Sequence, residues 1–151
     1  MTAAGAVLDT ASFAASTLDR PRDAQAELCV RAGYIALRRV ADFFRITYPP
    51  DPSPTDPITI RREEYDALYD ELAGIGVPLK PDRDQAWSDF AGWRVNYDVV
   101  LVALATLVMA PYAPWSSDRR VDYLAPSFFN VIRRRRWPGD RAGGQPDPSA
   151  R

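Results

Sequence analysis

The residues best suited to chemistry lie within twelve positions, where aromatic rings surround one arginine and one aspartate. They are Trp87, Trp93, Arg94, Tyr97 and Asp98. At helical spacing Trp87, Arg94 and Tyr97 share one side, and Asp98 follows Arg94 by one turn. A guanidinium between aromatic walls could bind an anionic ligand in a pocket. The same spacing fits a half-buried Arg–Asp pair that serves only the fold, and we favour that interpretation.

The composition leaves few other routes to catalysis. The chain has no His, a single Cys at Cys29 and a single Lys at Lys80. Without His, neither a His-assisted nucleophile nor a His-bearing zinc site can be built. The carboxylates of residues 63–71 have the spacing of a solvated helix face and not of a calcium loop. We therefore predict a protein that is not an enzyme and holds no metal or cofactor.

A second group of chemistry-bearing residues lies in the segment 121–137, where bulky apolar side chains stand beside four consecutive arginines. The residues concerned are Phe128, Phe129, Arg133, Arg134, Arg135, Arg136 and Trp137. This pattern is typical of contact with an anionic membrane surface. Phosphates of a nucleic acid could also bind it, although we regard nucleic acid as the weaker of these two candidates. The alternative to both is a disordered, soluble tail with neither role.

The distribution of charge separates an acidic body from a basic tail. Residues 1–118 carry 11 basic and 17 acidic side chains, a net charge of −6, whereas residues 119–151 carry 8 and 3, a net charge of +5. One Cys excludes an internal disulfide, and no secretory signal opens the chain. We therefore expect a cytoplasmic protein, with the tail directed to the inner face of the membrane.

Apolar periodicity predicts about four main helices that position these residues, at 6–18, 22–45, 59–74 and 82–110. In the first, a weak apolar face is formed by Val7, Ala11, Ala14 and Leu18. In the second, Glu27/Arg31 and Arg38/Asp42 are spaced as ion pairs, and Gly33 indicates close approach of a neighbouring helix. Five prolines in residues 48–57 predict an extended connector. Asp82 has the type and position of a helix N-cap.

The apolar run 99–110 raises the question of a membrane crossing. Twelve helical residues span about 18 Å, well short of the ~30 Å hydrocarbon layer. The run is apolar on all sides, which indicates a central helix enclosed by other helices. The segment PYAPW at 111–115 ends it, and we expect its aromatic rings to cover one end of the bundle, with a peptide-binding shelf as the alternative.

Three stretches together resemble a known group of proteins. They are residues 27–44, 56–82 and 86–119, and their most characteristic part is Trp93, the pattern R-x-x-Y at 94–97, the apolar run and P-x-x-P-W at 111–115. They are similar to the soluble region of bacterial, mainly actinobacterial, ion-channel-like or two-transmembrane potassium-channel-like membrane proteins. The pore helices and selectivity filter of those proteins have no counterpart here. The resemblance implies a cytoplasmic helical domain, either a stand-alone relative or the soluble part of a larger gene product.

These observations predict an all-α bundle of about four main helices, with a Pro-rich connector and a disordered basic C-terminal tail. We expect a single helical domain at 1–120, a short basic-aromatic segment at 121–137 and a disordered tail at 138–151. The expected function is that of a non-catalytic interaction or regulatory domain beside a membrane protein or an anionic membrane surface. The alternative is a small-molecule anion-binding protein or minor enzyme that uses the Arg94/Asp98 patch.

Overall fold

Local capping interactions explain where several helices begin. In the computed structural model, which describes residues 1–119, the carboxylate of Asp23 accepts hydrogen bonds from the backbone N–H groups of Gln25 and Ala26 at 3.0 and 3.2 Å. The predicted cap at Asp82 is confirmed, because its carboxylate accepts from the N–H of Gln85 at 2.9 Å. The elements are α1 (Thr2–Thr17), α2 (Ala24–Phe43), α3 (Arg62–Gly74), α4 (Arg83–Arg94) and α5 (Asp98–Leu107).

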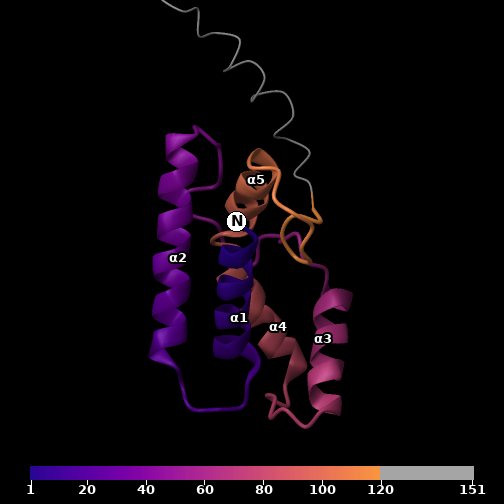
Figure 1. Cartoon of the computed structure of the whole chain (residues 1–151). Coiled ribbons are helices and arrows are strands. Elements are labelled where there is room, and N and C mark those ends of the chain that lie inside the picture. The colour runs from indigo at the N-terminus through magenta and orange to yellow at the C-terminus, as the bar shows by residue number, and fades with distance from the viewer. Residues whose placement is uncertain (120–151) are drawn as a thin grey trace, which may run out of the picture. The chain divides into compact units, whose positions relative to one another are not determined.

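The predicted all-α class is confirmed for the described residues. Residues 1–119 contain five helices and no strand, with one isolated bridge between Leu18 and Leu79. In Figure 1, α1 lies between α2 on one side and α3 on the other, with α4 behind it. Residues 48–57 form no helix, as their prolines predict, and lie in the connection between α2 and α3.

The prediction of one continuous helix over residues 82–110 is wrong, because α4 and α5 are separate helices bent by 53°. The side-chain amide of Asn96 donates to the carbonyls of Gly92 at 3.0 Å and Trp93 at 3.3 Å. It thereby takes acceptors that the backbone of a continuing helix would use. The backbone forms a tight turn here, in which the N–H of Tyr97 donates to the carbonyl of Arg94, three residues earlier, at 3.0 Å. This break accounts for five helices where about four were expected.

The interior of α5 is the centre of the core. Every residue from Val100 to Ala105 is at most 2% exposed, so this part of the apolar run is covered by the chain's own helices. The prediction of an enclosed helix is wrong for the end of the run, because Val108 is 51% and Met109 is 88% exposed. Within residues 1–119 no single helix meets the length and hydropathy of a membrane span. The bent pair α4 and α5 meets that test only when the two are taken together, by length and composition.

The buried face of α1 differs from the predicted one. The sequence predicts Val7 on the apolar face, yet it is 55% exposed. The buried residues are instead Gly5, Leu8, Asp9, Ser12, Phe13, Ser16 and Thr17. Four of these seven side chains are polar, and each has a hydrogen-bond partner, which removes most of the cost of burying them. An apolar periodicity therefore could not reveal this face.

Aromatic rings fill the space between α1, α3 and α4. Tyr65 is fully buried, and its ring centre lies 5.7 Å from Phe13, 5.5 Å from Phe90 and 5.2 Å from Trp87. Its hydroxyl lies 2.9 Å from the hydroxyl of Thr17. The side chain of Trp115 covers the edge of this cluster, with its ring centre 5.8 Å from that of Phe90. The predicted covering of one end of the bundle by the aromatic rings of 111–115 thus holds for Trp115, whereas Tyr112 is exposed.

Candidate functional site

The guanidinium of Arg94 is the centre of a fully buried polar cluster. The side chain is 0% exposed, and all three of its nitrogens donate hydrogen bonds. Nε donates to Asp98 at 2.7 Å, one terminal nitrogen donates to Asp9, and the other donates to the backbone carbonyl of Trp115. The predicted Arg94–Asp98 pair therefore forms. It is completely buried and has a third charged member, Asp9, which the sequence interpretation missed.

Further hydrogen bonds tie this cluster to most of the fold. Both carboxylate oxygens of Asp98 accept from Thr59, one from its N–H and one from its hydroxyl, each at 2.8 Å. The hydroxyl of Tyr97 donates to Asp9 at 2.9 Å and lies 2.9 Å from the hydroxyl of Ser12. One cluster thus connects α1, the junction of α4 and α5, the connector before α3 and the segment after α5.

The ionisation of the cluster follows from its surroundings. Burial alone would lower the pKa of Arg94, but the charges of Asp9 and Asp98 outweigh it and raise that pKa. Burial raises the pKa of Tyr97, and the neighbouring Asp9 raises it further. Burial also raises the pKa of Asp9 in spite of its pairing with Arg94. Arg94 therefore stays a cation and Tyr97 a neutral hydroxyl at neutral pH.

The chemistry open to this cluster is limited, because each nitrogen of the Arg94 guanidinium already donates a hydrogen bond to a protein acceptor. The donors of Arg94 are directed to protein acceptors, so an anion would have to displace a buried carboxylate to bind there. Within residues 1–119 no group of three or more His, Cys, Asp or Glu side chains could hold a metal ion. The geometry is that of a structural anchor that connects separate parts of the chain.

The two tryptophans predicted near Arg94 lie elsewhere. Trp87 belongs to the aromatic cluster, and the guanidinium of Arg62 lies 5.8 Å from its ring centre. Trp93 lies beneath Arg31, also at 5.8 Å. Of the five residues in the predicted patch, the structure brings together Arg94, Tyr97 and Asp98. The predicted tail residues Phe128, Phe129, Arg133–Arg136 and Trp137 lie outside the described residues.

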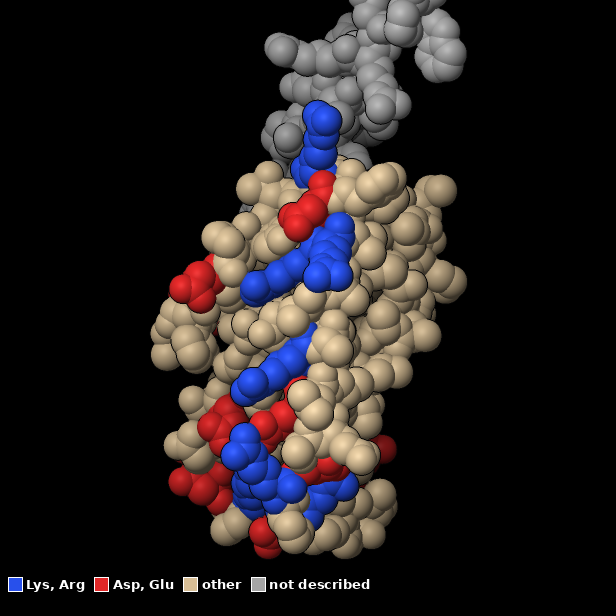
Figure 2. Space-filling model, turned by 90° about the vertical axis from the view of Figure 1, so that its left-hand side faces the viewer, with Lys and Arg blue, Asp and Glu red and all other residues tan. Residues whose placement is uncertain are grey.

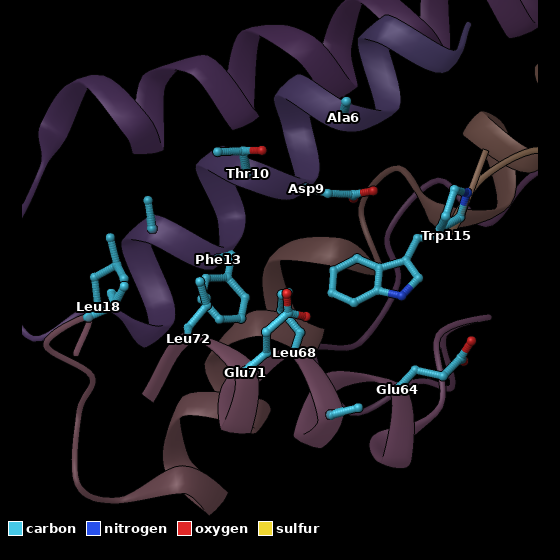
Figure 3. Close-up of a pocket in the computed structure, with 14 residues that line it drawn as sticks. Ala6, Asp9, Thr10, Phe13, Leu18, Glu64, Leu68, Glu71, Leu72 and Trp115 are labelled. Atoms are coloured by element: carbon cyan, nitrogen blue, oxygen red, sulfur yellow. The ribbon is translucent and has the colours of Figure 1, made fainter. Parts of the chain in front are cut away.

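A groove between α1 and α3, which we call the α1–α3 groove, opens beside this cluster. It has a volume of about 800 Å³. Its walls are α1, through residues that include Ala6, Thr10 and Ala14, and α3, through residues that include Ala67, Leu68 and Glu71. Figure 3 shows Phe13 and Leu68 directed into the space between the two helices, with Trp115 at one end and Leu18 near the other. The lining is mainly apolar.

The outward side of α2, which we call the α2 outer face, exposes apolar side chains at helical spacing. Leu28 is 63% exposed and Phe43 is 81% exposed, and Ile35 lies between them on the same side. Exposed alanines at 24, 32 and 36 complete the stripe. A helix with one apolar face toward the core and a second toward solvent is unusual for an isolated domain.

Four arginines of α2 and of the turn after it lack carboxylate partners. The guanidinium of Arg31 lies over the ring of Trp93, and that of Arg38 donates to the carbonyls of Asn96 and Pro50. Arg31, Arg38, Arg39 and Arg45 form no ion pair within residues 1–119, whereas Arg61, Arg62, Arg83, Arg94 and Arg119 all do. The predicted pairs Glu27/Arg31 and Arg38/Asp42 do not form, because Glu27 binds Arg22 and Asp42 accepts from the hydroxyl of Tyr48. In Figure 2 the basic side chains are spread along this side of the molecule, and the acidic ones gather mainly at the end where α2 begins.

Comparisons with protein-family models, curated proteins and solved structures found no match for this chain. The resemblance to the soluble region of ion-channel-like membrane proteins therefore stays a prediction that rests on the residues quoted for it.

Proposed function

We propose that this chain is a non-catalytic interaction domain that works at the inner surface of a membrane, with the α2 outer face directed to anionic lipid. The observation that carries the proposal is the combination of exposed apolar side chains on α2 with two exposed arginines that form no ion pair within residues 1–119. These are Arg39 on α2 and Arg45 two residues after its end. Leu28, Ile35 and Phe43 would enter the interfacial region, while Arg39 and Arg45 would meet lipid phosphates. The resemblance to soluble regions of membrane proteins points to the same location.

The magnitudes are sufficient for reversible binding. Each Arg near an anionic surface contributes about 1 kcal/mol, and full burial of one large apolar side chain contributes roughly 1.5–3 kcal/mol. The acidic helix α3 lies on the far side of α1, which is about 10 Å in diameter. That separation is about one Debye length at ~0.1 M salt, so the repulsion of α3 from the lipid is screened.

The same arrangement gives less support to the alternative of a small-molecule anion site at Arg94. Its guanidinium donors are engaged by Asp9, Asp98 and the carbonyl of Trp115. A membrane-facing domain of this kind would act by contact with lipid or with a membrane protein, and it would need no catalytic group.

Co-sedimentation of the full chain with lipid vesicles tests the proposal. We expect binding to vesicles that contain phosphatidylglycerol and little binding to phosphatidylcholine alone. The double variant Arg39→Gln/Arg45→Gln should weaken binding at least tenfold, because two favourable charge contacts are lost. Phe43→Ser should weaken it as well. Arg61→Gln is the matched control, since it removes an exposed arginine next to α3.

Two outcomes would contradict the proposal. One is an absence of binding to either vesicle type. The other is equal binding by the parent and both α2 variants, with binding lost only in the Arg133–Arg136→Ala variant of the full chain. That second result would assign the membrane contact to the basic segment and leave the α2 outer face without this role.

A further inference from the structure

The α1–α3 groove has the dimensions and lining of a site for an elongated partner. Both walls are helices, and their groove residues recur every three or four positions. From Ala6 to Leu18 the wall formed by α1 extends for about 18 Å, at 1.5 Å per residue. Because the apolar lining is contiguous, it differs from the single exposed apolar residues that are common on protein surfaces.

The end wall of the groove is held in a fixed position. Trp115 adopts the left-handed backbone region at φ 63°, which is uncommon for a residue with a side chain. Its carbonyl accepts a hydrogen bond from the buried Arg94, and its ring contacts Phe90. The buried cluster therefore keeps the indole directed into the groove (Figure 3), and the opening exists before any partner binds.

The charged residues around the groove indicate the sign of the charge that a partner would carry. Helix α3 contains five acidic residues and one basic residue, a net charge of −4. Most of these carboxylates are paired, including Glu64 with Arg119. Glu71 lines the groove, is exposed and forms no ion pair within residues 1–119. A partner that places a cation beside Glu71 would therefore complement the groove.

The backbone of the walls indicates the conformation of the partner. The N–H and C=O groups of α1 and α3 bond within their own helices and present no edge to an extended peptide. A partner that is itself helical satisfies its own backbone and can bury an apolar face between two helices. The groove therefore favours a helix over a strand.

We propose that the α1–α3 groove binds an amphipathic helix of a partner protein. The apolar face of that helix lies on Phe13, Leu68 and Trp115, and one of its Lys or Arg side chains meets Glu71. This site is separate from the α2 outer face, which lies on the other side of α1 (Figure 1). The domain could thus bind lipid through α2 and a basic helix of a protein through the groove at the same time.

A synthetic amphipathic helix with Leu on one face and Arg on the other tests this inference by titration calorimetry with the full chain. We expect saturable binding, and at least tenfold weaker binding of a peptide in which every Arg is replaced by Glu. Glu71→Lys should weaken binding of the Arg peptide at least tenfold. Glu63→Lys is the matched control, because it makes the same charge change at an exposed position of α3 outside the groove and should bind normally.

A second variant fills the groove without entering the core. Ala67 is exposed and lines the groove, so Ala67→Trp should abolish peptide binding and leave the thermal unfolding midpoint unchanged. The α2 variant Arg39→Gln/Arg45→Gln should bind the peptide like the parent, which separates this test from the lipid test. The inference is overturned by absence of binding, by equal losses in Glu71→Lys and Glu63→Lys, or by full binding to Ala67→Trp.

Other occupants would give distinct results. A dimer in solution that Ala67→Trp converts to a monomer would assign the groove to a second copy of the chain. Saturable binding of a neutral apolar dye that Ala67→Trp abolishes, without binding of the peptide, would assign it to a small molecule. Either result would overturn the proposal of a basic helix.

Discussion

Helix α1 meets its two neighbours in different ways. Toward α2, Gly33 allows the helices to approach so closely that a Cβ atom at position 33 would lie 2.2 Å from Leu8 Cδ2. This confirms the close approach predicted from Gly33. Toward α3, large rings of Phe13 and Tyr65 fill the space, with ring centres 5.7 Å apart. Close packing at Gly33 brings α1 and α2 together, whereas the aromatic rings between α1 and α3 lie beside the α1–α3 groove.

The contrast shows how one small domain can present two unlike surfaces. Where the backbones of α1 and α2 approach each other, α2 covers the apolar side chains of α1 with one face. The second apolar face of α2 is exposed to solvent. Where rings separate the helices, the edges of the ring cluster remain accessible in a groove with acidic surroundings. The buried cluster around Arg94 contacts α1 through Asp9 and the groove through Trp115, so it holds both arrangements in place.

The largest effect is expected from Arg94→Met, which should destabilise the packing of α1 against both α2 and α3. It would leave Asp9 and Asp98 buried without a counter-charge, at a cost of about 3–5 kcal/mol. Urea unfolding followed by circular dichroism measures this free energy. Arg83→Met is the control in the same helix, because its partners Asp66 and Asp70 are partly exposed. Similar losses in the two variants would show that the cluster is no anchor.

Two substitutions of Tyr65 distinguish the contribution of its ring to stability from the contribution of its hydrogen bond. Tyr65→Ala should cost about 3–5 kcal/mol, because it removes the ring in contact with Phe13, Trp87 and Phe90. Tyr65→Phe keeps the ring and loses the bond to Thr17, at a cost of about 1 kcal/mol. Differential scanning calorimetry of both variants gives the comparison. Equal costs would mean that the hydroxyl, and not the ring, sets the spacing between α1 and α3.

A pair of glycine substitutions compares the two sides directly. Gly33→Ala should destabilise by about 1–3 kcal/mol, since its methyl group would collide with the buried Leu8. Gly74→Ala at the end of α3 meets nothing within 4 Å and should stabilise by up to about 1 kcal/mol through helix propensity. Chemical denaturation of the two variants measures whether each substitution raises or lowers the free energy of unfolding. A stabilising Gly33→Ala would contradict close packing between α1 and α2.

The smallest effect concerns acid stability on the α3 side. Burial would raise the pKa of Glu64, but its bonds with Arg119 and Arg61 outweigh burial and lower that pKa from 4.5 to about 2. The unfolded chain therefore binds the proton at higher pH than the folded chain does, and stability is lost as pH falls from about 5 to 2. Unfolding midpoints across this range should fall less steeply in Glu64→Gln than in the parent.

The control for this pH series is Glu63→Gln, which removes a carboxylate from the same turn of α3 and leaves Arg119 untouched. It should retain the slope of the parent. If Glu64→Gln retains that slope too, the contact between Arg119 and Glu64 does not contribute to acid stability.

Much of the fold was predictable because helix signals are local. Asp82 marks a helix start, five prolines between 48 and 57 exclude a helix, and the apolar run predicts a buried segment, which the structure confirms for residues 100–105. The Arg94–Asp98 pair was also predictable, because four residues separate its members on one chain segment. In each case the interacting groups lie within a few residues of one another.

The remaining features depend on groups that are distant in sequence. Asp9 lies 85 residues from Arg94, and nothing near it in the chain signals a buried cation partner. The polar face of α1 and the α1–α3 groove likewise depend on segments far apart in the sequence, whereas the break at Asn96 arises locally, where its side-chain amide donates to the carbonyls of Gly92 and Trp93. Local signals were enough to place most of the helical segments. Which faces of those helices are buried depends on the folded chain, because a polar face can be buried once a distant segment supplies its partners.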